Sequence, residues 1–123
     1  MPDDLWDILI IGAGAAGLAT AIFAARAARD TNRRTSILLL EGAPRVGAKI
    51  LVSGGGRCNV THDRIDASDY YASPNIVKRV LRSFDENDAV DWMYEMGVEL
   101  KTEATGKLFP VTDRAATVRD ALL

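Results

Sequence analysis

The sequence predicts an α/β fold in which parallel strands alternate with helices, and three observations lead to this prediction. Residues 7–11 and 36–40 are almost continuously apolar, as is typical of parallel strands that are covered on both faces. Glycines at positions 12, 14 and 17 follow the first apolar run in a G-x-G-x-x-G pattern. Residues 15–28 are rich in alanine and long enough for a helix. Together these features predict a Rossmann-type βαβ unit.

The glycine turn is the first candidate binding site. Gly12 permits a tight turn, Gly14 lets the backbone approach a pyrophosphate, and Gly17 lets the helix pack against the strand. The first amides of such a helix point at the phosphates, and the helix dipole favours their negative charge. The glycine pattern alone is weak evidence, because runs of glycine and alanine are common. The strands and the helix around it favour a dinucleotide site.

Glu41 ends the second apolar run and is the candidate ribose ligand. It lies 24 residues after Gly17, close to the spacing of about 20 residues expected for the carboxylate that binds the ribose hydroxyls. The alternative is an ordinary solvated acid at the end of a strand. The complete βαβ unit favours the ribose contact.

Composition and charge exclude several classes of protein. A chain of 123 residues with 48% hydrophobic and 26% charged residues is typical of one soluble globular domain. A net charge of −2 provides no electrostatic surface for nucleic acid, so no nucleic-acid partner is expected. The single cysteine excludes an internal disulfide, and one cysteine with one histidine argues against a structural metal site.

Residues 8–25 contain no charged side chain and approach the length of a membrane span. The glycine pattern inside this run argues against a membrane helix. Asp3, Asp4 and Asp7 precede the run, where a signal peptide would carry basic residues. We therefore expect a cytoplasmic chain without a membrane partner.

A second glycine-rich stretch, residues 53–61, follows a loop at 42–47 and an apolar run at 48–52. The apolar run predicts either one helical turn or a short extended piece. Three consecutive glycines form either a flexible linker or a surface where the backbone meets a flat or phosphorylated ligand. Lysine, serine, arginine, asparagine and threonine side chains are packed around these glycines, which is unusual for a linker. We therefore expect a second part of the binding site here.

The chain is expected to have two parts. Residues 1–62 carry the βαβ unit and the glycine-rich loop, and the pattern of residues 63–123 predicts an inserted helical and hairpin segment. Apolar periodicity and helix-start signals define the elements of this segment. An irregular stretch at 63–71 is followed by a helix from Pro74 to Phe84. The next helix is capped either by Ser83 together with Glu86 or by Asp85, and it ends at Gly97. Strands at 98–102 and 107–111 precede a last helix over 114–123, which is capped by Thr112 or Asp113.

Three pieces of the chain together resemble one bacterial family: residues 11–17, residues 47–61 and residues 106–115. Many dinucleotide-binding families share the first piece, whereas the middle piece, GAKILVSGGGRCNVT, is highly specific. The chain resembles the NAD(P)/FAD-dependent oxidoreductases, some of which are described as aminoacetone oxidase-like or as bile-acid dehydro-reductase-like (BaiN-like). The resemblance covers nearly the whole chain. The family commonly continues Asn-x-Thr-Asn, whereas here His62 follows Thr61, so no role is assigned to position 62.

This resemblance implies FAD as the cofactor and therefore a Rossmann-type FAD-binding core. It places Gly12, Gly14, Ala15, Ala16 and Gly17 along the pyrophosphate, with Glu41 at the hydroxyls of the adenosine ribose. A second set of residues would lie along the phosphate, ribityl and flavin groups: Lys49, Ser53, Gly54, Gly55, Arg57 and Asn59.

The predicted function is the FAD-binding portion of a flavin-dependent oxidoreductase acting on a small-molecule substrate, with NAD(P)H as a candidate electron donor. Family members are several times longer, so this chain is expected to hold an incomplete core and to be inactive alone. Two alternatives stay open. One is an NAD-dependent dehydrogenase, for which residues 53–61 have no evident use. The other is a non-catalytic or truncated nucleotide-binding protein. No catalytic residue can be named from the sequence.

Three side chains near the glycine-rich loop have plainer alternatives. Cys58 has no partner cysteine, so we expect a small packed side chain rather than a redox thiol. His62 is expected to be a solvated loop residue rather than a base. Arg57 either satisfies loop carbonyls or binds the flavin or a phosphate, and we favour the second because guanidinium matches phosphate oxygens.

Overall fold

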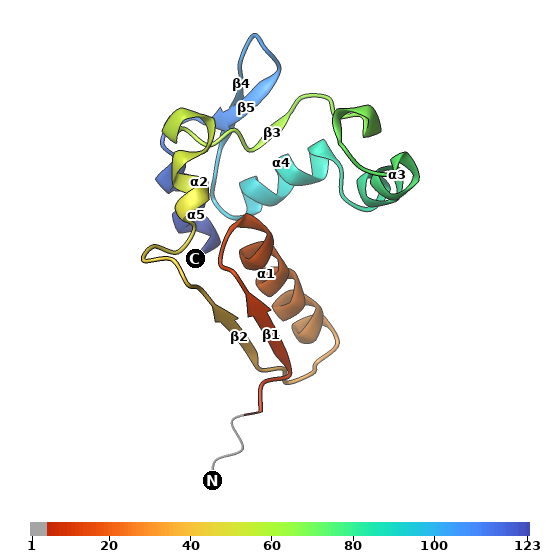
Figure 1. Cartoon of the computed structure of the whole chain (residues 1–123), viewed down its shortest axis with the longest axis vertical. Helices are drawn as coiled ribbons and strands as arrows, with labels where there is room; N and C mark the ends of the chain where they lie inside the picture. The colour runs from red at the N-terminus through yellow and green to blue at the C-terminus, as the bar shows by residue number, and fades with distance from the viewer. Residues whose placement is uncertain (1–4) are drawn as a thin grey trace.

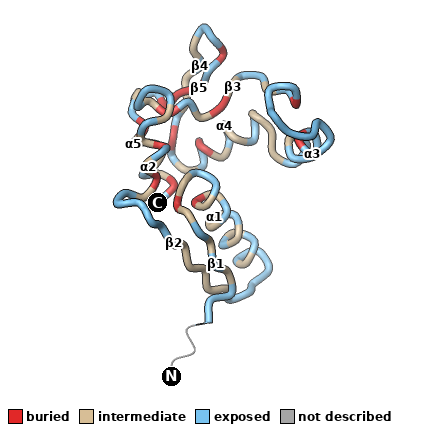
Figure 2. The backbone as a smooth tube through the Cα atoms, viewed as in Figure 1, coloured by how far each residue is buried: buried red, intermediate tan, exposed pale blue. Residues whose placement is uncertain are grey.

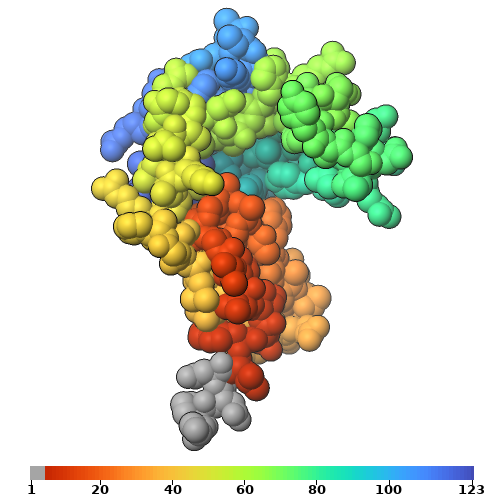
Figure 3. All heavy atoms as spheres, viewed as in Figure 1, coloured from red at the N-terminus to blue at the C-terminus, as the bar shows by residue number. Residues whose placement is uncertain are grey.

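The computed structural model describes residues 5–123 and shows the predicted α/β architecture (Figure 1). Asp3 and Asp4, whose charges argue against a signal peptide, lie outside the described residues. The βαβ unit extends from the rest of the molecule, whose elements gather beside the N-terminus of its helix (Figures 1 and 3). Within residues 5–123, no helix is both long enough and apolar enough to cross a membrane.

The predicted βαβ unit is present. β1 (Ile8–Ile11) and β2 (Ile37–Leu40) form a two-stranded parallel sheet, with Ile8 opposite Ile37 and Ile11 opposite Leu40. α1 (Ala15–Asp30) connects them and ends two residues beyond the predicted position 28. Alanine has the highest helix propensity, and its small side chain lets α1 lie close to the sheet.

The second half of the chain contains the predicted helices and hairpin. Residues 48–52 are helical, which decides between the two structures that the sequence allowed. β3, β5 and β4 form a small antiparallel sheet in that order. The elements are α2 (Ala48–Val52), η1 (Ser53–Gly56), β3 (Thr61–His62), η2 (Ala67–Asp69), α3 (Pro74–Ser83), α4 (Glu86–Glu95), β4 (Leu100–Thr102), β5 (Lys107–Pro110) and α5 (Ala115–Leu122).

The loop predictions for His62 and for residues 63–71 were wrong in part. His62 belongs to β3, where it pairs with Lys107, and this two-residue strand is too short to leave an alternating pattern. Residues 67–69 form a 3₁₀ turn, which two side chains cap. The Asp66 carboxylate accepts the backbone amide of Ser68, and the Asp69 carboxylate accepts the backbone amide of Asp66.

The caps of α4 and α5 differ. Asp85 caps α4, because its carboxylate accepts two backbone amides of the first turn at 2.9 Å. The prediction that Thr112 or Asp113 caps α5 was wrong, because the N-cap residue is Arg114, which makes no side-chain cap bond. The Asp113 carboxylate is bonded to Lys101 instead.

One core connects the two halves of the chain. The core lies where the N-terminus of α1 meets α2, α4 and α5 (Figure 2). Trp92 of α4 packs on Phe23 of α1 with ring centroids 5.1 Å apart, and Met93 is buried, so this stripe is core, as predicted. The buried cluster contains Ala13, Leu18, Ile50, Cys58, Met93, Val98, Ala115, Val118 and Leu122.

One face of the β1–β2 sheet is open to solvent. Side chains alternate between the two faces of a strand. Ile10 lies on the α1 side, because its Cγ2 is 3.5 Å from the position of a Cβ at Gly17. Leu9 and Ile11 lie on the other side and are 55% and 82% exposed. Apolar strands of this kind need cover on both faces, and the described residues supply it on one.

We expect residues 1–123 to bind an apolar dye and to self-associate through this open face. Replacing Leu9 and Ile11 together by threonine keeps the β-propensity but removes apolar surface. Dye fluorescence and the associated fraction in size-exclusion chromatography should therefore both fall. Ile10→Thr is the matched control, because it should lower the free energy of unfolding by about 1–3 kcal/mol without reducing dye binding. Unchanged dye binding in the double variant would contradict this assignment.

Candidate dinucleotide site

The glycine turn has the geometry that the sequence predicted. Gly12 has φ 98°, in the left-handed region, and its amide donates to the Leu40 carbonyl at 2.7 Å. A Cβ on Gly17 would lie 1.8 Å from the Gly12 carbonyl oxygen. Only glycine at position 17 therefore lets α1 approach the end of β1 this closely.

The start of α1 offers free donors beside open space. Gly14 is the N-cap residue, and among the described residues no side chain caps α1 and no acid lies in its first turn. A Cβ built on Gly14 would meet nothing within 4 Å. Ala15 and Ala16 are exposed. The N-terminus of α1 can therefore accept an anion without displacing another group.

Glu41 lies directly beside this turn. Its carboxylate accepts the amides of Ala13 and Ala43, each at 2.8 Å. The amide of Ala43 first, and then that of Ala13, holds the pKa of the Glu41 carboxyl below its ordinary value. Glu41 is therefore ionised at neutral pH, and each oxygen keeps a lone pair for a further donor.

Ala13 connects the glycine turn to the segment that begins α2. Its side chain is 1% exposed, and its carbonyl accepts the amide of Gly47 at 2.9 Å. Gly47 has φ 66°, and a Cβ there would lie 2.7 Å from Cγ of Arg119 in α5. Ala13 and Gly47 are absent from the predicted site, although each lies in one of the pieces that carry the family resemblance.

The second group of predicted residues lies on α2 and on the loop that follows it. Gly54, Gly55 and Gly56 all have positive φ, at 54°, 68° and 84°. A Cβ on Gly54 would lie 2.6 Å from the Asn59 amide nitrogen, whereas a Cβ on Gly55 would meet open space. Lys49 and Asn59 are exposed. The backbone of this loop is thus presented without side chains, as a ligand-facing surface requires.

The Ser53 hydroxyl of this loop is hydrogen-bonded within the chain, and the Cys58 side chain is buried. The Ser53 hydroxyl donates to the Ile50 carbonyl at 2.7 Å, which leaves its oxygen able to accept a bond. Cys58 is a free cysteine and 7% exposed, in agreement with a packed side chain rather than a redox thiol.

Arg57 points to the β4–β5 hairpin and not into open solvent. Its Nη1 donates to Glu103 Oε1 at 2.8 Å, and its guanidinium carbon lies 3.9 Å from the centroid of the Phe109 ring. Glu103 and Phe109 were not predicted as neighbours, because no spacing rule links them to the glycine-rich loop. The structure therefore gives Arg57 intramolecular partners that the sequence did not indicate.

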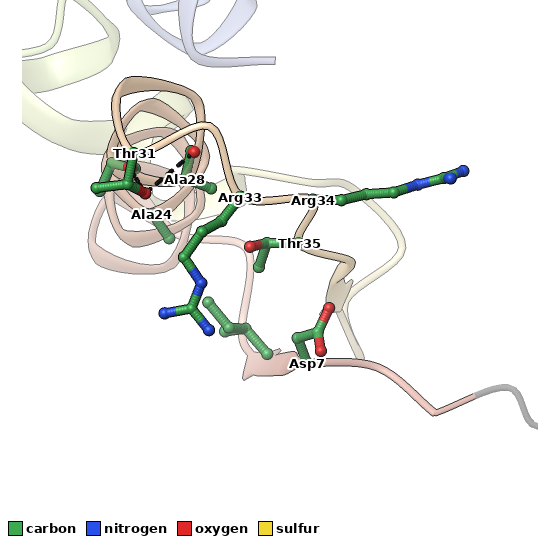
Figure 4. Close-up of a pocket in the computed structure, with 9 residues that line it drawn as sticks. Asp7, Ala24, Ala28, Thr31, Arg33, Arg34 and Thr35 are labelled. Carbon is green, nitrogen blue, oxygen red and sulfur yellow. Dashed lines mark hydrogen bonds between the residues drawn. The ribbon is translucent and has the colours of Figure 1, made fainter.

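A separate hollow lies at the opposite end of the βαβ unit (Figure 4). It is lined by residues from the start of β1, the C-terminal half of α1 and the loop before β2, among them Asp7, Ala24, Thr31 and Arg33. Dinucleotides bind beyond the carboxyl ends of parallel strands, whereas this hollow lies at their amino ends. It is therefore not the predicted site.

Comparison with known proteins finds relatives that match most of this chain. Over 114 residues the chain is 36% identical to a 3-dehydro-bile acid delta(4,6)-reductase of Clostridium scindens, covering 92% of this chain and 27% of the relative. It is 34% identical over 119 residues to a ribosomal RNA dihydrouridine synthase of Escherichia coli, covering 96% and 28%. It is 28% identical over 115 residues to a fumarate reductase (cytochrome) of Shewanella frigidimarina, covering 80% and 19%.

The chain thus spans about a quarter of the length of the first two relatives. Residues 6–123 match the family model described as HI0933-like protein Rossmann domain. These matches confirm the family resemblance that the three motifs predicted. The chain therefore belongs to the HI0933-like Rossmann domain family, and residues 6–123 correspond to the Rossmann domain of that family.

Proposed function

We propose that the glycine turn and the glycine-rich loop bind FAD, and that the chain is the FAD-binding portion of a reductase. The start of α1 carries this proposal, because within residues 5–123 its amides have no side-chain cap and the space at Gly14 is open. The pyrophosphate would be held by Gly12, Gly14, Ala15, Ala16 and Gly17.

Glu41 would select the adenosine end of the cofactor. Its carboxylate oxygens each accept one backbone amide, and their remaining lone pairs would accept the ribose hydroxyls. Its negative charge would repel the additional 2′-phosphate of NADP.

The glycine-rich loop would hold the other half of FAD. Its backbone faces open space at Gly55, which is what a flat ring or a phosphate needs for close approach. Arg57 lies at the end of the same loop with its guanidinium turned to the hairpin. The residues proposed along the phosphate, ribityl and flavin groups are Lys49, Ser53, Gly54, Gly55 and Asn59.

The names of the three relatives suggest a class of substrate. The names describe the reduction of a 3-dehydro-bile acid at the delta(4,6) positions, the formation of dihydrouridine and the reduction of fumarate, and we take their common feature to be a carbon–carbon double bond conjugated to a carbonyl group. We propose the same class here, with FAD supplying the hydride and NAD(P)H as the electron donor. The net charge of −2 does not favour an RNA partner for this chain, so we propose a small organic substrate and a cytoplasmic location.

Two other functions use parts of the same site. An NAD-dependent dehydrogenase would need the glycine turn but not the stretch at residues 53–61. A non-catalytic protein would bind FAD without passing electrons on. A flavin absorbance spectrum separates the first alternative from our proposal, and reduction of an artificial electron acceptor separates the second.

FAD should bind residues 1–123 more tightly than NADP does. The reason is the Glu41 carboxylate, so Glu41→Gln should reduce the preference for FAD at least several-fold. Flavin fluorescence and calorimetric heat would measure both affinities. Glu99→Gln is the matched control, because Glu99 is exposed and lies outside the site. Tighter binding of NADP than of FAD to the unmodified chain would contradict the proposal.

Gly14→Val should abolish FAD binding and leave the fold largely intact. The valine side chain would fill the space that the pyrophosphate needs, and apart from Gly14 and its two chain neighbours no residue lies within 4 Å of the Cβ position. Ala25→Val, at an exposed position of the same helix, controls for the added branches. Circular dichroism would check the fold, and flavin fluorescence would measure binding. FAD affinity equal to that of the unmodified chain would show that Gly14 serves the fold alone.

A further inference from the structure

A cluster of charges joins the glycine-rich loop to the β4–β5 hairpin. Both terminal nitrogens of Arg57 donate to Oε1 of Glu103, one of them at 2.8 Å. The guanidinium also stacks on the ring of Phe109, which is 5% exposed. A planar guanidinium can make both contacts at once, whereas a lysine cannot make the two-pronged bond.

Asp113, which lies two residues before the start of α5, is also part of this cluster. Its Oδ1 lies 3.7 Å from Nε of Arg57, and its Oδ2 accepts a bond from Lys101 in β4. The hydrogen bond from Lys101 holds the pKa of the Asp113 carboxyl below its ordinary value, so this carboxylate is ionised at neutral pH. The cluster therefore contains two cations and two anions.

The backbone on both sides of the cluster is held in an uncommon conformation. Cys58, which follows Arg57, has φ 61°, and Asp113 has φ 54°. Left-handed residues other than glycine persist where their surroundings determine them. Phe109 also limits the loop directly, because its Cε1 would lie 2.9 Å from a Cβ on Gly54. The hairpin thus shapes both ends of the glycine-rich loop.

We propose that Arg57 is a positioning residue that holds the glycine-rich loop on the β4–β5 hairpin through Glu103, Phe109 and Asp113, rather than a ligand of the flavin. This inference rests on the proposed function for its effect on FAD, but the loop geometry itself is independent of FAD. The Arg57 guanidinium is paired with side chains of the same chain, so the backbone of the glycine-rich loop, and not the arginine, would contact the cofactor.

Hydrogen exchange of the loop tests the proposal without FAD. The Cys58 amide donates to the Ser53 carbonyl at 3.0 Å and reports on loop closure. Glu103→Gln should raise its exchange rate at least tenfold and leave the Leu18 amide of α1 unchanged, whereas Glu99→Gln should change neither rate. The exchanged pair Arg57→Glu with Glu103→Arg should restore much of the protection. The proposal would be overturned if Glu103→Gln left the exchange rate of the Cys58 amide unchanged. It would also be overturned if the Leu18 rate rose equally and the exchanged pair did not reverse this rise.

FAD affinity provides the second arm. Arg57→Ala and Glu103→Gln should each weaken FAD by roughly tenfold, and the double variant should be no weaker than either single variant. Lys107→Ala, at an exposed hairpin position, should leave the affinity unchanged. Loss of affinity in Arg57→Ala alone would make Arg57 a direct ligand and overturn the proposal. If the unmodified chain binds no FAD, the proposed function fails, and the exchange rates still decide the role of Arg57.

Discussion

The candidate site depends on the two backbone hydrogen bonds of Ala13. Its amide donates to Glu41 at the end of β2, and its carbonyl accepts from Gly47 at the start of α2. One buried residue of the glycine turn thus contacts both the end of β2 and the start of α2, which lie on the far side of α1 in the sequence. The close approach of Gly17 to the Gly12 carbonyl completes the connection from the side of α1. A turn held from several sides loses little conformational entropy when a ligand binds.

The two glycine-rich segments are held in different ways, and this difference has a consequence for function. The first turn is held through its own backbone groups, one of which donates to the Glu41 carboxylate, and the amides at the start of α1 stay free for an anion. Side-chain charges hold the second loop, with Arg57 and Glu103 each about one third exposed. An ion pair of this kind is stronger than a fully solvated one but still sensitive to its surroundings. Changes in the hairpin therefore affect the second loop more than the first turn.

The features that could be predicted from the sequence are those set by interactions between residues close together in the chain. The apolar runs, the glycine spacing and Glu41 follow from strand, turn and helix preferences that act over short distances. The contacts of Arg57 could not be predicted, because Glu103 lies 46 positions away and opposite charges have no characteristic spacing in sequence. The same network explains why the predicted cap of α5 was wrong, because the Asp113 carboxylate accepts a hydrogen bond from Lys101 instead of from the amides at the start of the helix. β3 was missed because two residues are too few for a periodic pattern.

The most direct test of the account is the change in backbone amide NMR shifts when FAD is added to residues 1–123. The account predicts that the largest changes fall on Gly14 to Gly17 and on Gly54 to Gly55, with smaller ones near Glu41. This measurement also detects weak binding, which matters for a chain that spans about a quarter of its relatives. Changes confined to the hollow around Asp7 and Arg33, or no changes at millimolar FAD, would contradict the central claim.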